Sequence, residues 1–380
     1  MLAPGAIAPQ LAVIIPLPDH RGPAWECMRS WTSGQTLSRE NYEVIVVADG
    51  REPQLEAQVR ALLTPHDRLL VVPNVSLEAC GNLGAQASQA PWLLFTEAHV
   101  QATADCLEQL LTAIASERFD VASLASSGIQ TTRFAAQEQL LYDEALLERL
   151  ASGWNCCTVR GFAIGRQLFE RAGGFPEDYG HFGELLLGAS LAQLRARLGY
   201  ASRARVSHFN DGDLTHFWET LIAFGRDEIR FRADHPDSPL LEQLGPCRLW
   251  DERQAYDRAT AWCQLGQFLR SGFRSLTHGE PRATGRALEQ AYRAARHLLF
   301  GLTWSQGKTL LATGWALLRL WLNPSDDAQY LQAFRDYWSS LIQLGRLRQV
   351  SAELSRATSP AKESRPDTSS GVHSVLRRAA

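Results

Sequence analysis

The chain has 380 residues, 45% of them hydrophobic, so it can bury the core of one large α/β domain together with a smaller appended region. Its formal net charge of -3 at pH 7 argues against a general nucleic-acid binder. The seven cysteines include no Cys-x-x-Cys pair, so the sequence shows neither a zinc framework nor a dithiol redox motif.

Buried strands alternate with helical segments near the N-terminus. Residues 11–19 begin with a continuous apolar run that prolines stop, which is typical of a parallel strand covered on both faces. Residues 42–50 and 69–73 repeat this pattern, and residues 23–31 and 77–90 have helical character. Because strands that alternate with helices form crossover units, the sequence predicts an α/β domain with a mostly parallel, Rossmann-like sheet flanked by helices.

A further apolar run, which starts at Trp92, ends in Glu97-Ala-His99, where the chain becomes polar. A carboxylate and an imidazole two residues apart at a strand end can project to one side and share a divalent ion with a ligand phosphate. Asp19 and Asp49 also follow strands, at the edge of a parallel sheet where ligands bind. A solvated strand end has the same kind of residues, so this prediction depends on the motifs around it.

Several motifs follow one another in order along residues 10–235. They are Ile14-Ile-Pro16-Leu-Pro-Asp19, Ile45-Val-Val-Ala-Asp49-Gly50, Gly81-Asn82-Leu-Gly84, Glu97-Ala-His99, Gly173-Gly174-Phe175 and Gly183-Glu184. In this order and spacing the chain resembles the family 2 glycosyltransferases of the GT-A fold, with Glu97-Ala-His99 in place of the usual Asp-x-Asp metal motif. The resemblance implies an inverting enzyme that transfers a sugar from a nucleotide-diphosphate donor to an acceptor hydroxyl.

The resemblance also implies where the donor nucleotide binds. It carries this role over to Pro16, Leu17 and Asp19 after the first strand, to Asp49 after the second strand, and to Asn82 on the following helix. The sequence does not name the sugar, the nucleotide base or the acceptor.

By the same resemblance, a divalent metal is held by Glu97 and His99. A third ligand is expected after the catalytic helix, where His208 is the first choice and His216 is the competitor. Imidazole is a softer ligand than carboxylate, so this set predicts Mn²⁺ in preference to Mg²⁺. Other histidines, His181 among them, are interpreted as surface or hydrogen-bonded structural residues.

Inverting transfer needs a base that takes the proton of the acceptor hydroxyl. The resemblance gives this role to Glu184, which opens a helical stretch after a turn-rich segment. The alternative is an ordinary first-turn carboxylate that the helix dipole favours. Glu177 and Asp178 are interpreted as turn residues. Arg160 and Trp154 are candidates for contact with the acceptor or a phosphate, although an exposed strand arginine is the simpler interpretation of Arg160.

Besides the metal motif, four positions depart from the family pattern, one of them Glu184, which stands where the family has a catalytic aspartate. Ala48 replaces an acidic residue, and Gly81 and Ser190 each replace an arginine. Two function classes therefore remain. The first is a metal-dependent glycosyltransferase that builds a cell-surface polysaccharide or glycolipid, or modifies a small acceptor. The second is a catalytically degenerate GT-A protein that binds nucleotide sugars or acts as a scaffold.

Helical periodicity replaces strand signals in the C-terminal part of the chain. The sequence predicts a GT-A domain over residues 1–238, an all-helical region over 239–350 and a disordered tail over 351–380. Four helices are expected within the helical region, separated by Gly, Pro or Asn-Pro breaks: Arg253–Phe273, Arg282–Leu302, Ser305–Leu322 and Asp326–Val350.

The third of these helices contains Trp315 and Trp321 but is interrupted by Lys308 and Arg319. It falls short of the ~20 apolar residues that a transmembrane helix needs, so a packed helix is expected, with an interfacial membrane helix as the alternative. The helical region is either an acceptor-side or membrane-side module, or a cover that completes the core of the sheet.

The predicted partners are a nucleotide-diphosphate sugar and a saccharide, lipid-linked or small-molecule acceptor, without nucleic acid. The odd cysteine count, and an N-terminus without a charged stretch followed by a cleavable apolar segment, predict a cytoplasmic protein. Peripheral contact with the inner face of the cell membrane is a further option.

Overall fold

The computed structural model describes residues 9–152, 160–210, 212, 214–251, 302–322 and 325–358. The chain forms two compact units, the first made of residues 1–253 with 304–349 and the second of residues 254–303 with 350–380. Most of the second unit lies outside the described residues, as do Trp154 and nearly all of the two helices expected over residues 253–302. The fold is therefore described for the first unit.

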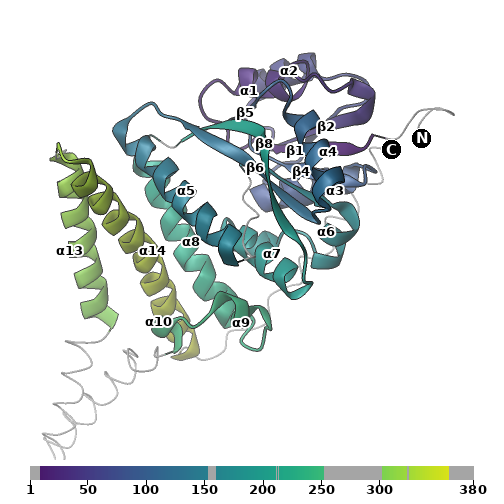
Figure 1. Cartoon of the computed structure of the whole chain (residues 1–380). Coiled ribbons are helices and arrows are strands. Elements are labelled where there is room, and N and C mark those ends of the chain that lie inside the picture. Colours follow the sequence, from purple (N-terminus) through teal and green to yellow (C-terminus); the bar gives the residue numbers. More distant parts are fainter. Residues whose placement is uncertain are drawn as a thin grey trace, which may run out of the picture. The chain divides into compact units, whose positions relative to one another are not determined.

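One sheet forms the centre of this unit (Figure 1). Its described strands are β1 (Leu11–Pro16), β2 (Tyr42–Ala48), β3 (Arg68–Val71), β4 (Trp92–Phe95), β5 (Val100–Ala102), β6 (Val121–Ile129), β7 (Phe162–Gly165) and β8 (Leu198–Phe209), in the order β3-β2-β1-β4-β7-β6-β8-β5. Strands β3, β2, β1 and β4 are parallel, as are β6 and β8. Strand β7 is antiparallel to both of its neighbours, and β5 is antiparallel to β8. The expected parallel part is confirmed, and antiparallel pairs extend it into a mixed sheet.

Helices cover both faces of the sheet, because successive side chains of a strand point to opposite faces. In β1, Val13 belongs to the core on one face and Ile14 to the core on the other, and both are fully buried. The first face packs against α1 (Ala24–Trp31), α2 (Pro53–Leu62) and α4 (Cys106–Glu117). The second packs against α3 (Leu77–Ala87), α6 (Arg166–Ala172) and α7 (Phe182–Gln193).

Four long helices build a further core and lie together in Figure 1: α5 (Arg133–Ser152), α8 (Leu214–Asp234), α13 (Leu302–Trp321) and α14 (Asp327–Thr358). The ring of Phe134 on α5 lies 5.0 Å from that of Phe217 on α8 and 4.9 Å from that of Phe334 on α14, measured between centroids. Ala316 and Leu320 of α13 are buried in the same cluster. The shorter helices are η1 (Arg39–Asn41), η2 (Glu177–Tyr179), α9 (Leu240–Leu244) and α10 (Arg248–Asp251).

The backbones of α8 and α14 touch where two glycines meet. A Cβ atom on Gly225 would lie 2.1 Å from the carbonyl oxygen of Ile342, and a Cβ atom on Gly345 would lie 2.1 Å from that of Ile222. Only a residue without a side chain fits at such a distance, so these two positions allow the helices to pack closely. The C-terminal helix is in this way joined to the helix that follows the sheet.

The helices of the C-terminal region pack against the domain that contains the sheet. Residues 304–349 group with the sheet domain in one compact unit, so α13 and α14 share a core with α5 and α8. Helix α14 continues to Thr358, past the end expected at residue 350. The domain boundary at residue 238 and the disorder of the tail stay predictions. Among the described helices, none combines the length and apolar character that crossing a membrane requires.

Replacing Gly225 with alanine should lower the free energy of unfolding by about 1–3 kcal/mol, because the new methyl group has to push two helix backbones apart. The matched control is Gly314→Ala in α13, where a Cβ atom would meet nothing within 4 Å. That alanine should be neutral or should stabilise the helix by up to about 1 kcal/mol. Urea unfolding compares the two variants, and equal effects would contradict the close contact of α8 with α14.

Candidate active site

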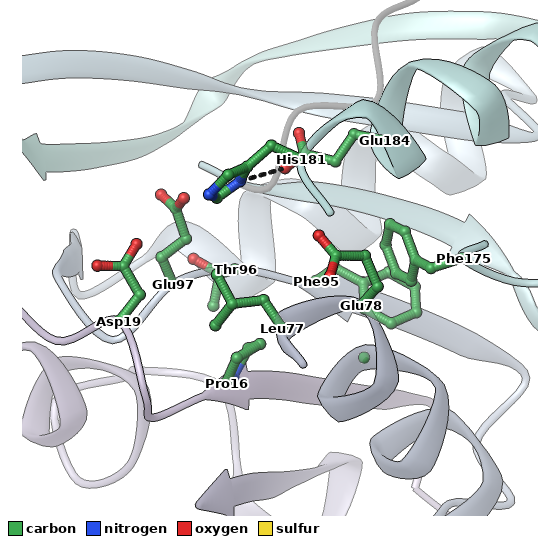
Figure 2. Close-up of a pocket in the computed structure, with 11 residues that line it drawn as sticks. Pro16, Asp19, Leu77, Glu78, Phe95, Thr96, Glu97, Phe175, His181 and Glu184 are labelled. Carbon is green, nitrogen blue, oxygen red and sulfur yellow. Dashed lines mark ion pairs between the residues drawn. The ribbon is translucent and has the colours of Figure 1, made fainter. Parts of the chain in front are cut away.

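A pocket opens where the parallel strands β1 and β4 end at the same edge of the sheet (Figure 2). Helices α3 and α7 begin at this pocket, so their first turns supply side chains to its wall. The lining brings four carboxylates and one imidazole together with apolar side chains. It consists of Pro16, Asp19, Leu77, Glu78, Gly81, Phe95, Thr96, Glu97, Phe175, His181 and Glu184.

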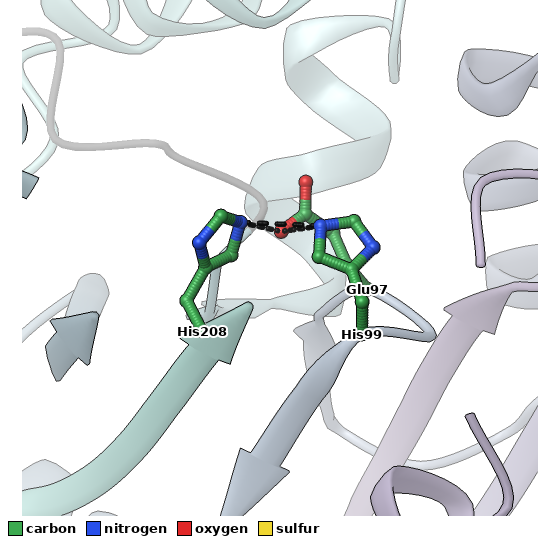
Figure 3. Close-up of side chains that lie close together, drawn as sticks. All are labelled: Glu97, His99 and His208. Carbon is green, nitrogen blue, oxygen red and sulfur yellow. Dashed lines mark hydrogen bonds and ion pairs between the residues drawn. The ribbon is translucent and has the colours of Figure 1, made fainter. Parts of the chain in front are cut away.

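Glu97, His99 and His208 cluster beside this pocket, and Figure 3 shows both imidazoles facing the carboxylate. Nε2 of His99 lies 3.1 Å from Nε2 of His208, and Oε2 of Glu97 lies 3.4 Å and 3.3 Å from these two nitrogens. The antiparallel pairing of β5 with β8 places Val100 opposite His208. This register brings the two histidines together although they are 109 residues apart.

Hydrogen bonds set the tautomers of both histidines. Nδ1 of His99 donates to the backbone carbonyl oxygen of Asp19 at 2.8 Å. Nδ1 of His208 donates to Oδ1 of Asn210 at 2.7 Å, and the Asn210 amide is oriented by its own donation to the carbonyl oxygen of Ala135 at 2.9 Å. Because each neutral ring carries its proton on Nδ1, each Nε2 presents a lone pair.

The resulting set of donor atoms fits a divalent cation. Two Nε2 lone pairs face one another, and Oε2 of Glu97 is buried without a hydrogen-bond partner among the described residues. A cation would satisfy all three atoms at once, and two imidazoles with one carboxylate suit a transition metal. The hydrogen bonds on the far side of each imidazole are of the kind that orients metal-binding histidines.

The electrostatics of the cluster favour the metal-binding forms of these groups. Burial opposes ionisation of Glu97, but the neighbouring His99 and His208, when protonated, outweigh it and hold the pKa of the carboxyl well below its usual range; a bound cation would replace the protons that face Glu97. Burial, together with the positive charge of Arg160, lowers the pKa of His208. An ionised carboxylate and a neutral imidazole are the forms that coordinate metals.

Glu184 stands in the first turn of α7, across the pocket from Glu97, and forms an ion pair with His181 (Figure 2). The distance from its Oε1 to Nδ1 of His181 is 4.0 Å. Burial lowers the pKa of His181, but Glu184 and the nearby Glu78 more than compensate and raise it to about 9. His181 therefore carries a positive charge at neutral pH, and Glu184 has a cationic neighbour in the pocket.

Two residues of this pocket, Glu78 and His181, had no role in the sequence-based site. Glu78 is buried near the start of α3, and burial raises the pKa of its carboxyl. The sequence contains one indication that His181 belongs to the site. It precedes Glu184 by three residues, and a spacing of three places side chains on one helix face. Glu78 precedes Asn82 by four residues on the same helix, but nothing in the sequence connects it with α7.

The residues expected to bind the donor divide into two groups. Pro16 and Asp19 line the pocket, whereas Leu17 is buried and gives its backbone N–H to the carbonyl oxygen of Val47. Asp49 lies at the end of β2 and accepts hydrogen bonds from the backbone and the guanidinium of Arg51. The pocket therefore brings Pro16 and Asp19, but not Leu17 or Asp49, to the candidate catalytic groups.

Asn82 holds the loop that leads to α7. Its side-chain nitrogen donates to the carbonyl oxygen of Phe175 and to Oε1 of Glu177, both at 2.8 Å, and its side-chain oxygen accepts from the backbone N–H of Phe175 at 2.9 Å. Gly174, with a φ of +72°, allows the chain to turn beside this amide. The contacts of Asn82 thus position the Phe175 turn, and a role in donor binding stays a prediction.

Arg160 is buried, unlike the exposed strand arginine that was the simpler expectation. Its guanidinium forms an ion pair with Glu138 at 2.6 Å and donates to Oε1 of Gln139 at 3.0 Å, and both partners lie on α5. His216, the competing third ligand, lies on α8 with Nε2 3.9 Å from Oδ1 of Asp19 and is not part of the candidate metal-ligand cluster of Glu97, His99 and His208.

Both the sequence and the fold of the chain match known proteins. Residues 13–172 match the family model described as Glycosyl transferase family 2. A solved structure of the mannosyltransferase PcManGT from Pyrobaculum calidifontis, in complex with GDP-Man and Mn²⁺, matches at a TM-score of 0.50 with 16% identity over 89% of this chain and 87% of that one. TarS 1–349 from S. aureus in complex with UDP gives a TM-score of 0.42 with 15% identity over 88% and 91% of the two chains.

No curated protein sequence matches the chain. The mannosyltransferase likeness concerns the fold, and the match to the family model covers the strands and helices that build the pocket up to α6. The chain therefore has a GT-A fold with a mixed sheet and flanking helices, and its residues 13–172 are similar to glycosyl transferase family 2.

Proposed function

We propose that this protein is a metal-dependent, inverting glycosyltransferase that moves a sugar from a nucleotide-diphosphate donor to an acceptor hydroxyl in the synthesis of a cell-surface polysaccharide or glycolipid. One observation carries the proposal: a candidate metal ligand and the candidate base line the same pocket. Glu97 belongs to the metal-ligand cluster and also lines the pocket that contains Glu184. Inversion requires the hydroxyl to attack the anomeric carbon from the side opposite the leaving diphosphate, so the base and the metal are needed on opposite sides of one sugar.

In this proposal Glu184 is the base. Its carboxylate takes the proton of the acceptor hydroxyl while the hydroxyl oxygen attacks the anomeric carbon and the bond to the diphosphate breaks. The positive charge of His181 keeps the Glu184 side chain in the pocket through their ion pair. A cation held by Glu97, His99 and His208 would supply a counter-charge for the diphosphate.

The proposed metal is Mn²⁺ in preference to Mg²⁺. Two of the three candidate ligands are imidazole nitrogens, and Mg²⁺ prefers oxygen ligands and keeps its water molecules. The Mn²⁺ in the mannosyltransferase complex supports this choice. A cytoplasmic location is also proposed, and it is supported by four buried free cysteines among the described residues, two of which, Cys27 and Cys80, have a pKa raised by burial to about 12.

A second candidate function is a nucleotide-sugar-binding or scaffold protein without turnover. One observation favours it. Asp49 is engaged by Arg51 and Asn82 by the Phe175 turn, so two expected donor ligands already have partners within the protein. The two functions differ in product formation, which the Glu184 experiment below measures.

Nucleoside diphosphate and Mn²⁺ should stabilise the protein cooperatively, by about 2.7 kcal/mol at a ligand concentration 100 times Kd, because they bind only the folded state. Glu97→Ala with His99→Ala should abolish the part that depends on Mn²⁺, and so should His208→Ala. His216→Ala is the matched control and should retain it. Thermal unfolding with UDP and GDP, each with and without Mn²⁺, measures the shifts. A full Mn²⁺ effect in the double variant would show that the metal binds elsewhere.

Glu184→Gln should retain donor binding and lose transfer by about 100-fold or more, because an amide keeps the shape of the side chain but cannot accept the proton. Asp178→Asn, in the exposed turn before α7, is the control and should transfer normally. Release of nucleoside diphosphate from a panel of sugar nucleotides and acceptors gives the rate. Wild-type rates for Glu184→Gln would remove this residue from the mechanism, and a wild type without turnover on any donor would favour the binding protein.

The ion pair of His181 with Glu184 should stabilise the fold in a defined pH range. The pKa of His181 is raised from 6.5 to about 9 in the folded protein, so the stabilisation is fully present below pH 6.5 and is lost as the pH rises through about 9. The difference in unfolding free energy between wild type and His181→Gln should shrink accordingly. Urea unfolding across this range measures it, and a difference that is independent of pH would contradict the raised pKa.

A further inference from the structure

The pocket of the proposed reaction is lined by acidic groups. Its described lining contains four carboxyl groups but no lysine or arginine, and its one basic side chain is His181. The positive charge of this imidazole is already balanced, because Glu184 forms an ion pair with it and the carboxylates of Glu78 and Asp19 also act on it. A further anion in the pocket would therefore find no free cationic side chain among the described lining residues.

The first two turns of α3 give the pocket a carboxyl group instead of a cation. Gly81 stands where the family pattern has an arginine, and a Cβ atom on it would lie 2.8 Å from a ring carbon of Phe175. The ring of Phe175 thus fills the space into which a side chain at position 81 would extend. One turn earlier, α3 contributes Glu78 to the pocket, and Figure 2 shows its carboxyl group pointing toward the side that holds His181 and Glu184.

Glu78 is enclosed by the protein, so solvent does little to screen its charge. Only 6% of the residue is exposed, and a Cβ atom on Gly183 would lie 3.3 Å from its Cγ, so α7 packs against this side chain. Burial raises the pKa of the Glu78 carboxyl; the charge of His181 opposes this shift and that of Glu184 adds to it. A second carboxylate beside Glu78 would therefore be costly to accommodate.

The transferred sugar lies in this pocket in the proposed reaction, because it has to reach both the diphosphate at the candidate metal-ligand cluster and the base Glu184. We propose that the pocket accepts an uncharged sugar and excludes a sugar that carries a carboxylate, and that Glu78 is a specificity-determining residue. This inference rests on the proposed function, since it concerns the sugar of the donor.

Hydrogen bonding and charge both favour an uncharged sugar. A sugar hydroxyl can donate a hydrogen bond to a carboxylate, whereas a sugar carboxylate has no proton to donate and would be buried beside like charge. A cation bound at the candidate metal-ligand cluster would not supply the missing partner, because the diphosphate offsets its charge. Unpaired charge of this kind discriminates against the wrong ligand without adding any contact to the right one.

Isothermal titration calorimetry with matched donors tests the proposal. UDP-glucose and UDP-glucuronic acid differ only in a hydroxymethyl group that a carboxylate replaces; UDP-galactose with UDP-galacturonic acid, and GDP-mannose with GDP-mannuronic acid, repeat the comparison. With Mn²⁺ and without acceptor, wild type should bind the uncharged member of its preferred pair at least about tenfold more tightly. Glu78→Gln should reduce this ratio by at least about threefold. It should change the affinity for bare UDP or GDP much less, because these ligands have no sugar.

Asp178→Asn removes a carboxylate from the exposed turn outside the pocket and is the matched control, which should keep the wild-type ratio. Circular dichroism verifies that the variants fold, and Glu78→Ser is a second variant with the same expected direction. Equal affinity of wild type for both members of every pair would overturn the proposal, and an unchanged ratio in both Glu78 variants would overturn the role of Glu78. If bare UDP or GDP binds while the pairs do not differ, this inference alone fails. If no nucleotide binds, the proposed function fails with it.

Discussion

The hydrogen bond from His99 to the carbonyl oxygen of Asp19 is the contact on which the site depends. It joins the segment after β1 to the turn between β4 and β5, and it fixes the proton of His99 on Nδ1 so that Nε2 faces Glu97 and His208. The antiparallel pairing of β5 with β8 places His208 opposite Val100, and the backbone N–H of Phe209 donates to the carbonyl oxygen of His99 at 3.1 Å. The geometry of the candidate metal site is therefore set by the short turn between β4 and β5, which is held against β8 and against the segment that follows β1.

The parts of the site that lie at strand ends could be predicted from the sequence. Glu97 and His99 follow an apolar run directly, and their spacing of two places both at one strand end. His208 could be proposed only from the family resemblance, because its approach depends on the pairing of two strands far apart in the chain. Its assignment as a metal ligand, like the roles of Glu97 and His99, is still a prediction.

Contacts between distant elements explain what the sequence could not indicate. Arg160 was expected on an exposed strand, but Glu138 and Gln139 of α5 bury it, and no local pattern relates these residues. His181 gained its charge from carboxylates on two helices, α3 and α7, that meet only in the folded protein. The contact of Gly225 with Ile342 likewise ties the C-terminal helix to α8, whereas helical periodicity alone was compatible with a separate module.

The central claim is that Glu97, His99 and His208 bind a transition metal through two imidazole nitrogens. Electron spin echo spectroscopy of the protein with Mn²⁺ and a nucleoside diphosphate tests it most directly, because the method detects nitrogen nuclei bound to the metal. Nitrogen modulation should be present in wild type, weaker in His208→Ala and absent when His99 and His208 are both replaced. Bound Mn²⁺ without nitrogen modulation in wild type would contradict the account.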